Sequence, residues 1–340
     1  MNKKERYDSI NGLRTIACIG IILTHIRINI GYPLTGEFSV KVINQFANFV
    51  FLFMVISAFV MCCGYYNKIK NNEISPEKFY SKRINKIYPF FLFLVIIDIV
   101  FEHNLSSLIE GFTDITLLFS FLSKNIEVIG VAWFLGLVFI FYLMFPFFTY
   151  LFGNKKRAWF VTLISLLMSL SCIYYFDVGR KNMFYSFLFF CIGGLIYLYK
   201  DNIIKIFNKT RIIGIVVLIT SIILYYTLPI SNEYILLLRA SIISISLLCY
   251  SISYNSKLLN NKITNFIGNI SFEIYLCHML IFRLIEKMKI TNLFGNNWIS
   301  YITTSLLVII GSIVFSMAFK LLYSTIEKGL NKNENRHYRT

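Results

Sequence analysis

The chain has 340 residues, of which 57% are hydrophobic and 17% aromatic, and its mean hydropathy is +0.66. Charged residues make up 15% of the chain, whereas soluble domains carry about a quarter, so an ordinary soluble domain is excluded. The formal net charge of +16 suggests a nucleic-acid partner, but the distribution of that charge argues against one.

Apolar runs near the length that a helix needs to cross ~30 Å of hydrocarbon recur along the whole chain. We therefore predict an all-α bundle of about ten transmembrane helices. The predicted spans are 12–30, 43–63, 86–101, 130–151, 158–175, 183–199, 211–227, 234–252, 264–284 and 299–323. A further apolar stretch near 115–122 is expected to be a re-entrant segment or a surface helix. The first run has no small-residue cleavage pattern after it, so we expect no cleavable signal peptide.

Lysines and arginines concentrate in alternate connections between the predicted spans. With the N-terminus inside, 22 of the 33 lie in inside connections or termini and 6 in outside connections. An excess of basic residues in cytoplasmic loops is the usual orientation signal of membrane proteins, so both termini are predicted to be cytoplasmic. The basic charge is thus interpreted as a topology signal and an attraction to membrane lipid, with no nucleic-acid partner.

One integral membrane domain over residues 1–330, followed by a short polar cytoplasmic tail over 331–340, is the simplest organisation. The seven cysteines lie in or beside apolar spans, and none forms a C-x-x-C pair. We interpret them as small packing residues and expect neither a disulfide framework nor a metal site.

The first span, within "NGLRTIACIGIILTHI" (11–26), contains Arg14 and His25. Eleven residues advance ~16 Å along a helix and turn it roughly 20° past three full turns, so the two side chains share one face. An ionisable residue at such depth normally faces the bundle interior or a wet cavity, and a functional site is the default hypothesis. The alternatives are a snorkelling anchor for Arg14 and an interhelical hydrogen bond for His25.

Two later segments add charges and histidine. "FYSKRINKIYPFF" (79–91) places Arg83 and Lys86 one turn apart at the inner mouth of the third span, where a charge anchor is the simpler interpretation. "ISFEIYLCHMLIF" (270–282) contains Glu273, Tyr275 and His278. Because five residues is a poor same-face spacing, Glu273 and His278 are expected to face different neighbours. Four further charges lie near outer ends of spans, where solvent is easy to reach, and are weak candidates: Arg27, Asp98, Arg239 and Arg283.

Together, these segments resemble the acyltransferase-3 family of membrane-integral acyltransferases. "RYDSINGLRTIACIGIILTHI" is similar to its opening motif, an arginine and then a histidine eleven residues later. "FVFLFMVISAFVM" (49–61) is similar to the second-span pattern, with Ser57 as its serine. "KRINKIYP" is similar to the basic motif that ends at a proline, and "ISFEIYLCHMLIF" is similar to the late Ser-Tyr…Tyr-Leu-x-His pattern.

The chain departs from this family at several positions. Many members have an acid where Asn11 stands, a second arginine where Lys86 stands and a tyrosine where Phe272 stands. A glutamate common in the frame of "AWFLGLVFIFYLMFPFF" (132–148) is replaced by Val138, and the second-span glycine by Ala58. The absence of the glutamate at Val138 suggests a branch with a different acceptor or partner.

The resemblance implies a multi-pass enzyme of the bacterial cytoplasmic membrane that transfers an acyl group, by default acetyl, from cytoplasmic acyl-CoA to a hydroxyl of a cell-surface polysaccharide or its lipid-linked precursor. It implies that Arg14, Arg83 and Lys86 bind the donor and that His25, with Arg14, is catalytic, as a general base or through an acyl-histidine. Ser57, Glu273, Tyr275 and His278 are expected along the acceptor path, and interhelical hydrogen bonding is the alternative for Ser57, Tyr275 and His278. The sequence leaves a homo-oligomer open.

The main alternative is a non-enzymatic transporter or flippase for a polysaccharide or a lipid-linked sugar. Transporters of that kind often contain repeats and paired broken helices. The sequence shows neither clearly, although the Gly193–Gly194 pair would suit one helix break.

Overall fold

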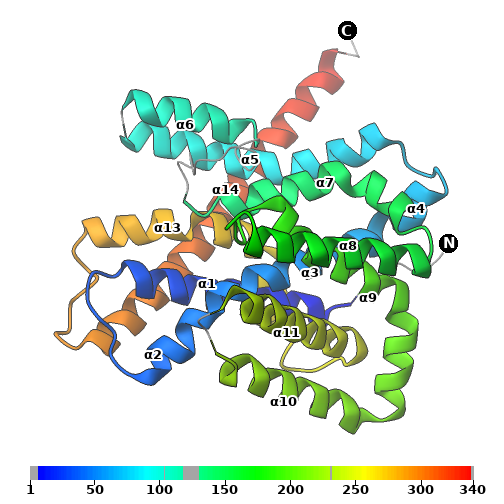
Figure 1. The fold of residues 1–340 in the computed structure, drawn as a ribbon. Helices are drawn as coiled ribbons and strands as arrows, with labels where there is room; N and C mark the ends of the chain where they lie inside the picture. The colour runs from blue at the N-terminus through cyan, green and yellow to red at the C-terminus, as the bar shows by residue number, and fades with distance from the viewer. Residues whose placement is uncertain (1–6, 103, 118–129, 230–231, 338–340) are drawn as a thin grey trace.

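The computed structural model describes residues 7–102, 104–117, 130–229 and 232–337, and the regular elements of this part of the chain are all helices (Figure 1). They are α1 (Ser9–Asn29), α2 (Glu37–Lys41), α3 (Phe49–Met61), α4 (Asn67–Lys70), α5 (Pro76–Glu102), α6 (Leu105–Ile115), α7 (Trp133–Leu151), α8 (Lys155–Tyr174), α9 (Met183–Lys209), α10 (Arg211–Thr227), α11 (Glu233–Ser253), α12 (Lys262–Asn269), α13 (Ser271–Lys287) and α14 (Asn297–His337). A 3₁₀ segment, η1 (Ile43–Asn48), precedes α3, and a π segment, η2 (Cys62–Tyr66), follows it.

The helices account for the predicted membrane spans. Among the described residues, 8 helical stretches are long and apolar enough to cross a membrane, and the bent pair α12–α13 raises the number to 9. Helix α10 is a shorter apolar helix of 17 residues. Each predicted span falls on one of these elements, so the predicted all-α membrane bundle is confirmed. The side of the membrane on which the termini lie stays a prediction.

Helix α1 lies in the interior of the bundle and contacts α3, α11, α12, α13 and α14. Two glycines allow its closest approaches. A methyl group at Gly12 would overlap the backbone of Leu259, and one at Gly268 would overlap the backbone of Asn11. Small residues are favoured between membrane helices because they let backbones come into contact. These contacts fix the position of α1 and therefore of the polar residues that it carries.

Helix α9 runs unbroken through Gly193 and Gly194. The suggestion that this pair marks a helix break is therefore wrong. A side chain at Gly193 would overlap the Val55 carbonyl and the Ala58 side chain of α3. One at Gly194 would overlap the ring of Phe148 in α7 and that of Phe152 just after it. The two glycines serve close packing against neighbouring helices.

Helix α5 begins ten residues before the predicted third span. Proline suits the first position of a helix, since its missing N–H would have no partner there, and Pro76 occupies that position. The Ser75 hydroxyl accepts a hydrogen bond from the Lys78 N–H at 3.3 Å, which caps the helix. Arg83 and Lys86 consequently lie inside α5, two to three turns from its start, and Pro89 is also within it.

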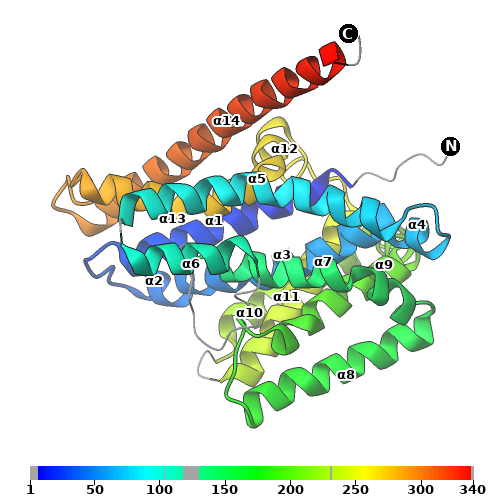
Figure 2. The ribbon, with the colours of Figure 1, turned by 90° about the horizontal axis from the view of Figure 1, so that it is seen from above.

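Helix α6 is absent from the predicted spans. Asn104 caps it by accepting a hydrogen bond from the Ser107 N–H at 2.7 Å, and Gly111 packs against Ile99 of α5. It lies alongside α5 in both views (Figures 1 and 2). Most of the apolar stretch 115–122, predicted to be re-entrant or on the surface, lies outside the described residues, which stop at 117 and resume at 130.

Helix α14 has 41 residues, which at 1.5 Å per residue makes it about twice as long as the hydrocarbon is thick. Its membrane-spanning stretch is Asn297–Glu327, and its C-terminal end extends beyond the bundle (Figure 2). The helical backbone continues through His337, into the region predicted to be a polar tail.

The packing of α9 against α3 makes a prediction about glycine. We expect Gly193→Ala to lower the free energy of unfolding by about 1–3 kcal/mol, the usual cost of overfilling a packed interior. Thermal unfolding of the detergent-purified protein, followed by intrinsic fluorescence, measures this. The matched control is Gly64→Ala in η2, where nothing lies within 4 Å of the added methyl group. Equal melting temperatures for the two variants would contradict the close contact.

Candidate active site

A cavity of about 280 Å³ lies among α1, α3, α5, α7 and α14, next to the bend that joins α12 to α13. Five of the residues singled out from the sequence line it, namely Arg14, Ser57, Lys86, Glu273 and Tyr275. The remaining lining consists of Phe53, Ile87, Phe134, Leu135, Val138, Tyr142, Gly268, Asn269, Ser271, Phe272 and Lys320. Segments more than 250 residues apart in sequence thus meet around one space.

The cavity is predominantly basic. Arg14 enters it from α1 and Lys86 from α5. The Arg14 guanidinium has the amide oxygen of Asn11 at 3.5 Å, one turn earlier on α1. Lys86 keeps access to solvent, and it lies within electrostatic range of Arg14, Arg83, Glu273 and Lys320. Three cations and one carboxylate line the cavity, which therefore favours an anionic ligand.

Arg83 lies beside the cavity and is not part of its described lining. Its guanidinium donates a hydrogen bond to the Tyr65 hydroxyl at 2.5 Å. It also sits 4.5 Å from the centroid of the Tyr65 ring and 5.8 Å from that of Tyr142, which is a cavity residue. Cation–π contacts of this kind hold a guanidinium in a fixed direction. Arg83 thus contacts the cavity residue Tyr142 without being part of the described lining itself.

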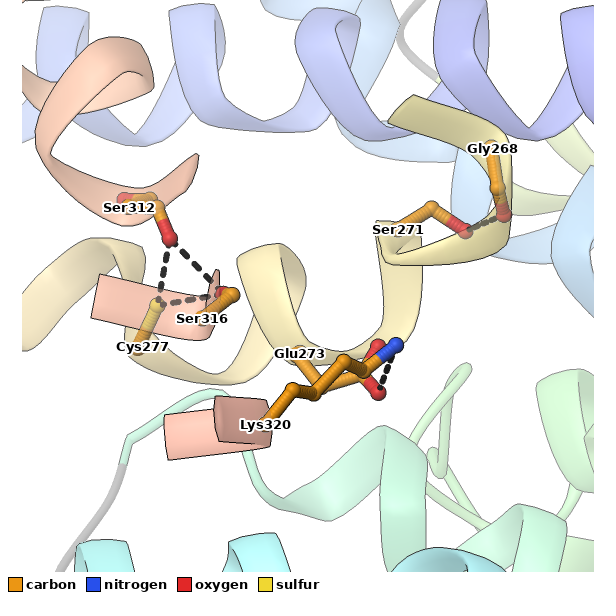
Figure 3. Close-up of polar contacts among 7 residues, drawn as sticks. All are labelled: Gly268, Ser271, Glu273, Cys277, Ser312, Ser316 and Lys320. Carbon is orange, nitrogen blue, oxygen red and sulfur yellow. Dashed lines mark hydrogen bonds and ion pairs between the residues drawn. The ribbon is translucent and has the colours of Figure 1, made fainter. Parts of the chain in front are cut away.

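Glu273 forms an ion pair with Lys320 across α13 and α14, with 2.8 Å between Oε1 and Nζ (Figure 3). The Glu273 side chain is 14% exposed and that of Lys320 43% exposed. Lys320 appears in the sequence only as a charge near the inner end of the last span. That it reaches the cavity depends on how α14 packs against α13, for which the sequence offers no local signal.

His25 and His278 form a hydrogen-bonded pair next to Tyr275. Nδ1 of His25 is 2.8 Å from Nε2 of His278. The two rings are inclined by 13°, with centroids 5.1 Å apart. At these values the rings lie edge to edge in nearly one plane, the geometry of an in-plane hydrogen bond and not of a face-to-face stack. Neither histidine is in the described lining of the cavity.

A backbone carbonyl sets the proton positions in this pair. Nδ1 of His278 is 2.5 Å from the carbonyl oxygen of Tyr275, and a carbonyl oxygen can only accept. Nδ1 of His278 therefore carries a hydrogen, and in the neutral ring Nε2 accepts. His25 must then donate from Nδ1, which leaves the lone pair of neutral His25 on Nε2. The arrangement thus selects one tautomer of His25.

Tyr275 connects the histidine pair to the cavity. Its ring belongs to the cavity wall, with centroids 5.4 Å from Phe134 and 5.8 Å from His278. Its hydroxyl donates to the carbonyl oxygen of Val131 at 3.1 Å. The residue is therefore held at both ends, by its own hydroxyl and by the bond from His278 to its carbonyl.

The charges expected near solvent at outer ends turn out to be bonded within the bundle. Arg239 is only 1% exposed. Its guanidinium donates to Gln45 Oε1 at 3.1 Å and lies 4.9 Å from the centroid of the Tyr225 ring. Arg283 pairs with Asp98 at 3.1 Å.

Arg27 behaves in the same way, donating to the Ser39 hydroxyl and to the Asn44 amide oxygen, each at 2.5 Å. These side chains link helices, and the expectation that they reach solvent is wrong for Arg239 and for Asp98, which is 6% exposed.

In the described part of the chain, no group of three or more His, Cys, Asp or Glu side chains is placed to hold a metal ion.

Comparison with known proteins identifies the family. The family model for acyltransferase 3, an acyltransferase domain, matches residues 7–319, which is most of the chain. No curated protein and no solved structure matches it. The chain therefore belongs to the acyltransferase 3 family, as the resemblance of its motifs indicated, and this membership implies acyltransferase activity.

Proposed function

We propose that this member of the acyltransferase 3 family moves an acyl group, acetyl by default, from acyl-CoA on the cytoplasmic side of a bacterial membrane to a hydroxyl of a cell-surface polysaccharide or its lipid-linked precursor. The observation that carries the proposal is one cavity whose lining holds Arg14 and Lys86 and also Tyr275, the residue that contacts the histidine pair. Such a site offers anion binding in a cavity whose wall includes a residue bonded to the histidine pair.

Arg14 and Lys86 are the proposed donor-binding residues. Charge-assisted hydrogen bonds to phosphate are the strong ones, and a guanidinium can make two of them at once, whereas an ammonium acts as a point charge. Arg83, held against Tyr65 and Tyr142, adds positive charge beside them. A volume of about 280 Å³ is slightly below the usual range for small-molecule sites. It suits the thin pantetheine arm, with the phosphates of the nucleotide beside Arg14 and Lys86.

Part of the cavity wall is apolar. Phe53, Phe134, Leu135 and Val138 line it from α3 and α7. An apolar wall accommodates the aliphatic and amide parts of the arm and limits the water that could hydrolyse a thioester. Val138 stands where many members have a glutamate, so the chain has a hydrophobic surface where those members have an acid.

His25 is the proposed general base. Its Nε2, the basic nitrogen of the selected tautomer, takes the proton of the acceptor hydroxyl as that oxygen attacks the thioester carbonyl. The tetrahedral intermediate then collapses with cleavage of the carbon–sulfur bond, and the histidinium returns its proton to the departing thiolate. General base help of this kind is typically worth about 10²–10⁴-fold in rate.

His278 is proposed as a positioning residue for His25. By donating to the Tyr275 carbonyl it presents Nε2 as an acceptor, and this acceptor keeps the hydrogen of His25 on Nδ1. The nearby polar groups Ser57, Tyr275 and Glu273 share the cavity with Arg14. Their proposed role along the acceptor path stays a prediction.

The transporter alternative retains one supporting observation. Helices α12 and α13 meet at a 72° bend, and broken helices are typical of transporter sites. Helix α9, however, is continuous, and the family match over residues 7–319 favours an enzyme.

Removing a donor-binding charge should raise the KM for acetyl-CoA. A hydrogen bond to a charged group is worth about 1.5–3 kcal/mol, so Arg14→Ala and Lys86→Ala are each expected to raise KM by about tenfold or more. A transfer assay with radiolabelled acetyl-CoA on protein in lipid measures this. The control is Lys82→Ala, an exposed lysine one turn earlier on α5. An unchanged KM in the Arg14 variant would assign that residue to membrane anchoring.

The histidine pair should affect turnover and leave donor binding intact. We expect His25→Ala to abolish transfer and His278→Leu to lower kcat by about 10²-fold, with KM for acetyl-CoA unchanged. His278→Gln should restore part of the rate, since an amide can donate to the Tyr275 carbonyl and accept from His25. A purely structural role would instead lower the melting temperature and give no rescue by glutamine. Radiolabel retained on the wild-type protein without acceptor would replace the general-base route with an acyl-histidine.

A further inference from the structure

The ion pair of Glu273 and Lys320 lines the same cavity as the proposed donor-binding residues. The family match assigns no role to this pair. The match ends at residue 319, one residue before Lys320. Both side chains belong to the cavity lining. Lys320 therefore brings a third positive charge beside Arg14 and Lys86, and Glu273 brings the carboxylate that partly balances them.

The packing of α14 against α13 fixes the position of the Lys320 backbone. One turn from the ion pair, the Cys277 sulfur lies 3.7 Å from the Ser312 carbonyl oxygen and 3.7 Å from the Ser316 hydroxyl oxygen. The Ser316 hydroxyl also donates to the Ser312 carbonyl oxygen at 2.7 Å. Figure 3 shows this contact along the same pair of helices as the ion pair. Small polar residues of this kind bring membrane helices close together.

The ion pair is only partly buried. The Lys320 side chain is 43% exposed and that of Glu273 14% exposed, so the ammonium is held less tightly than it would be in a fully buried pair. Lysine is a compact charge on a flexible stem, so its ammonium can reach a second anion without movement of the helix. A phosphate offers more charge and more acceptor oxygens than one carboxylate.

We propose that Lys320 is a further donor-binding residue, which exchanges Glu273 for a phosphate of coenzyme A when the donor enters the cavity. Glu273 holds the ammonium toward the cavity while the site is empty and competes with the phosphate for it. This inference rests on the proposed function, because it takes acyl-CoA to be the donor.

The exchange predicts effects of opposite sign in two variants. Lys320→Ala should weaken the affinity for CoA by about tenfold, because one charge-assisted contact is lost. Glu273→Gln should strengthen it by roughly two- to fivefold, because the competing carboxylate is removed and the shape of the side chain is kept. Pantetheine, which has no phosphate, should bind all three proteins equally. Isothermal titration of the purified protein in lipid nanodiscs measures each affinity.

The matched control is Lys41→Ala. Lys41 pairs with Glu37 at 3.0 Å on an exposed helix and is also solvent-accessible, but it is not part of the cavity lining. The Lys41→Ala variant should leave the affinity for CoA unchanged. Melting temperatures of all variants show whether each is folded, and Glu273→Gln remains informative if Lys320→Ala is not.

The outcomes separate the inference from the proposed function. If the wild-type protein binds CoA, and the affinity is unchanged in Lys320→Ala or lowered in Glu273→Gln, the proposed role of Lys320 is overturned. The proposal that acyl-CoA is the donor then still stands. Wild-type protein that binds no CoA overturns the proposed donor, and the role of Lys320 with it.

Discussion

The cost of an ionised side chain in hydrocarbon determines where the charged residues of this chain lie. Translocation scales place that cost at about 2.5–3.5 kcal/mol for arginine, lysine or aspartate at the centre of a span. The chain offsets this cost in two ways. Arg239 and the Arg283–Asp98 pair are bonded to other helices, whereas Arg14 and Lys86 face a shared cavity. The first group stabilises the bundle, and the second is available to a ligand.

The same constraint explains the break between α12 and α13. Irregular backbone is tolerated at membrane depth only where protein buries it or where it lines a wet cavity. The break brings Gly268, Asn269 and Ser271 into the cavity lining. The hydroxyl of Ser271 donates to the carbonyl oxygen of Gly268 at 2.9 Å, which satisfies a carbonyl that the interrupted helix leaves open (Figure 3). The bend is therefore part of the site and not a defect in a span.

Hydropathy was sufficient to predict the spans, because it depends on short stretches of sequence. The spacing of Glu273 and His278 also predicted correctly that they face different neighbours, Lys320 and His25 respectively. The identity of those neighbours could not be predicted, since the partners of His278 and Arg239 lie 253 and 194 residues away. Lys320 was missed because its partner Glu273 is also distant in the sequence. The early start of α5 was missed because the first turns of this helix are polar.

The position of α1 accounts for the way the site is assembled. This helix carries Arg14 near one end and His25 near the other, and it contacts both halves of the bent pair. The half formed by α12 approaches it through Gly268, and the half formed by α13 supplies His278. A change that moved α1 along its axis would thus displace the cation and the histidine together, relative to a wall that comes from α3, α5 and α7. Because Arg14 and His25 share one rigid helix, their separation is set by helix geometry. The neighbouring helices select the tautomer of His25 and supply the rest of the cavity wall.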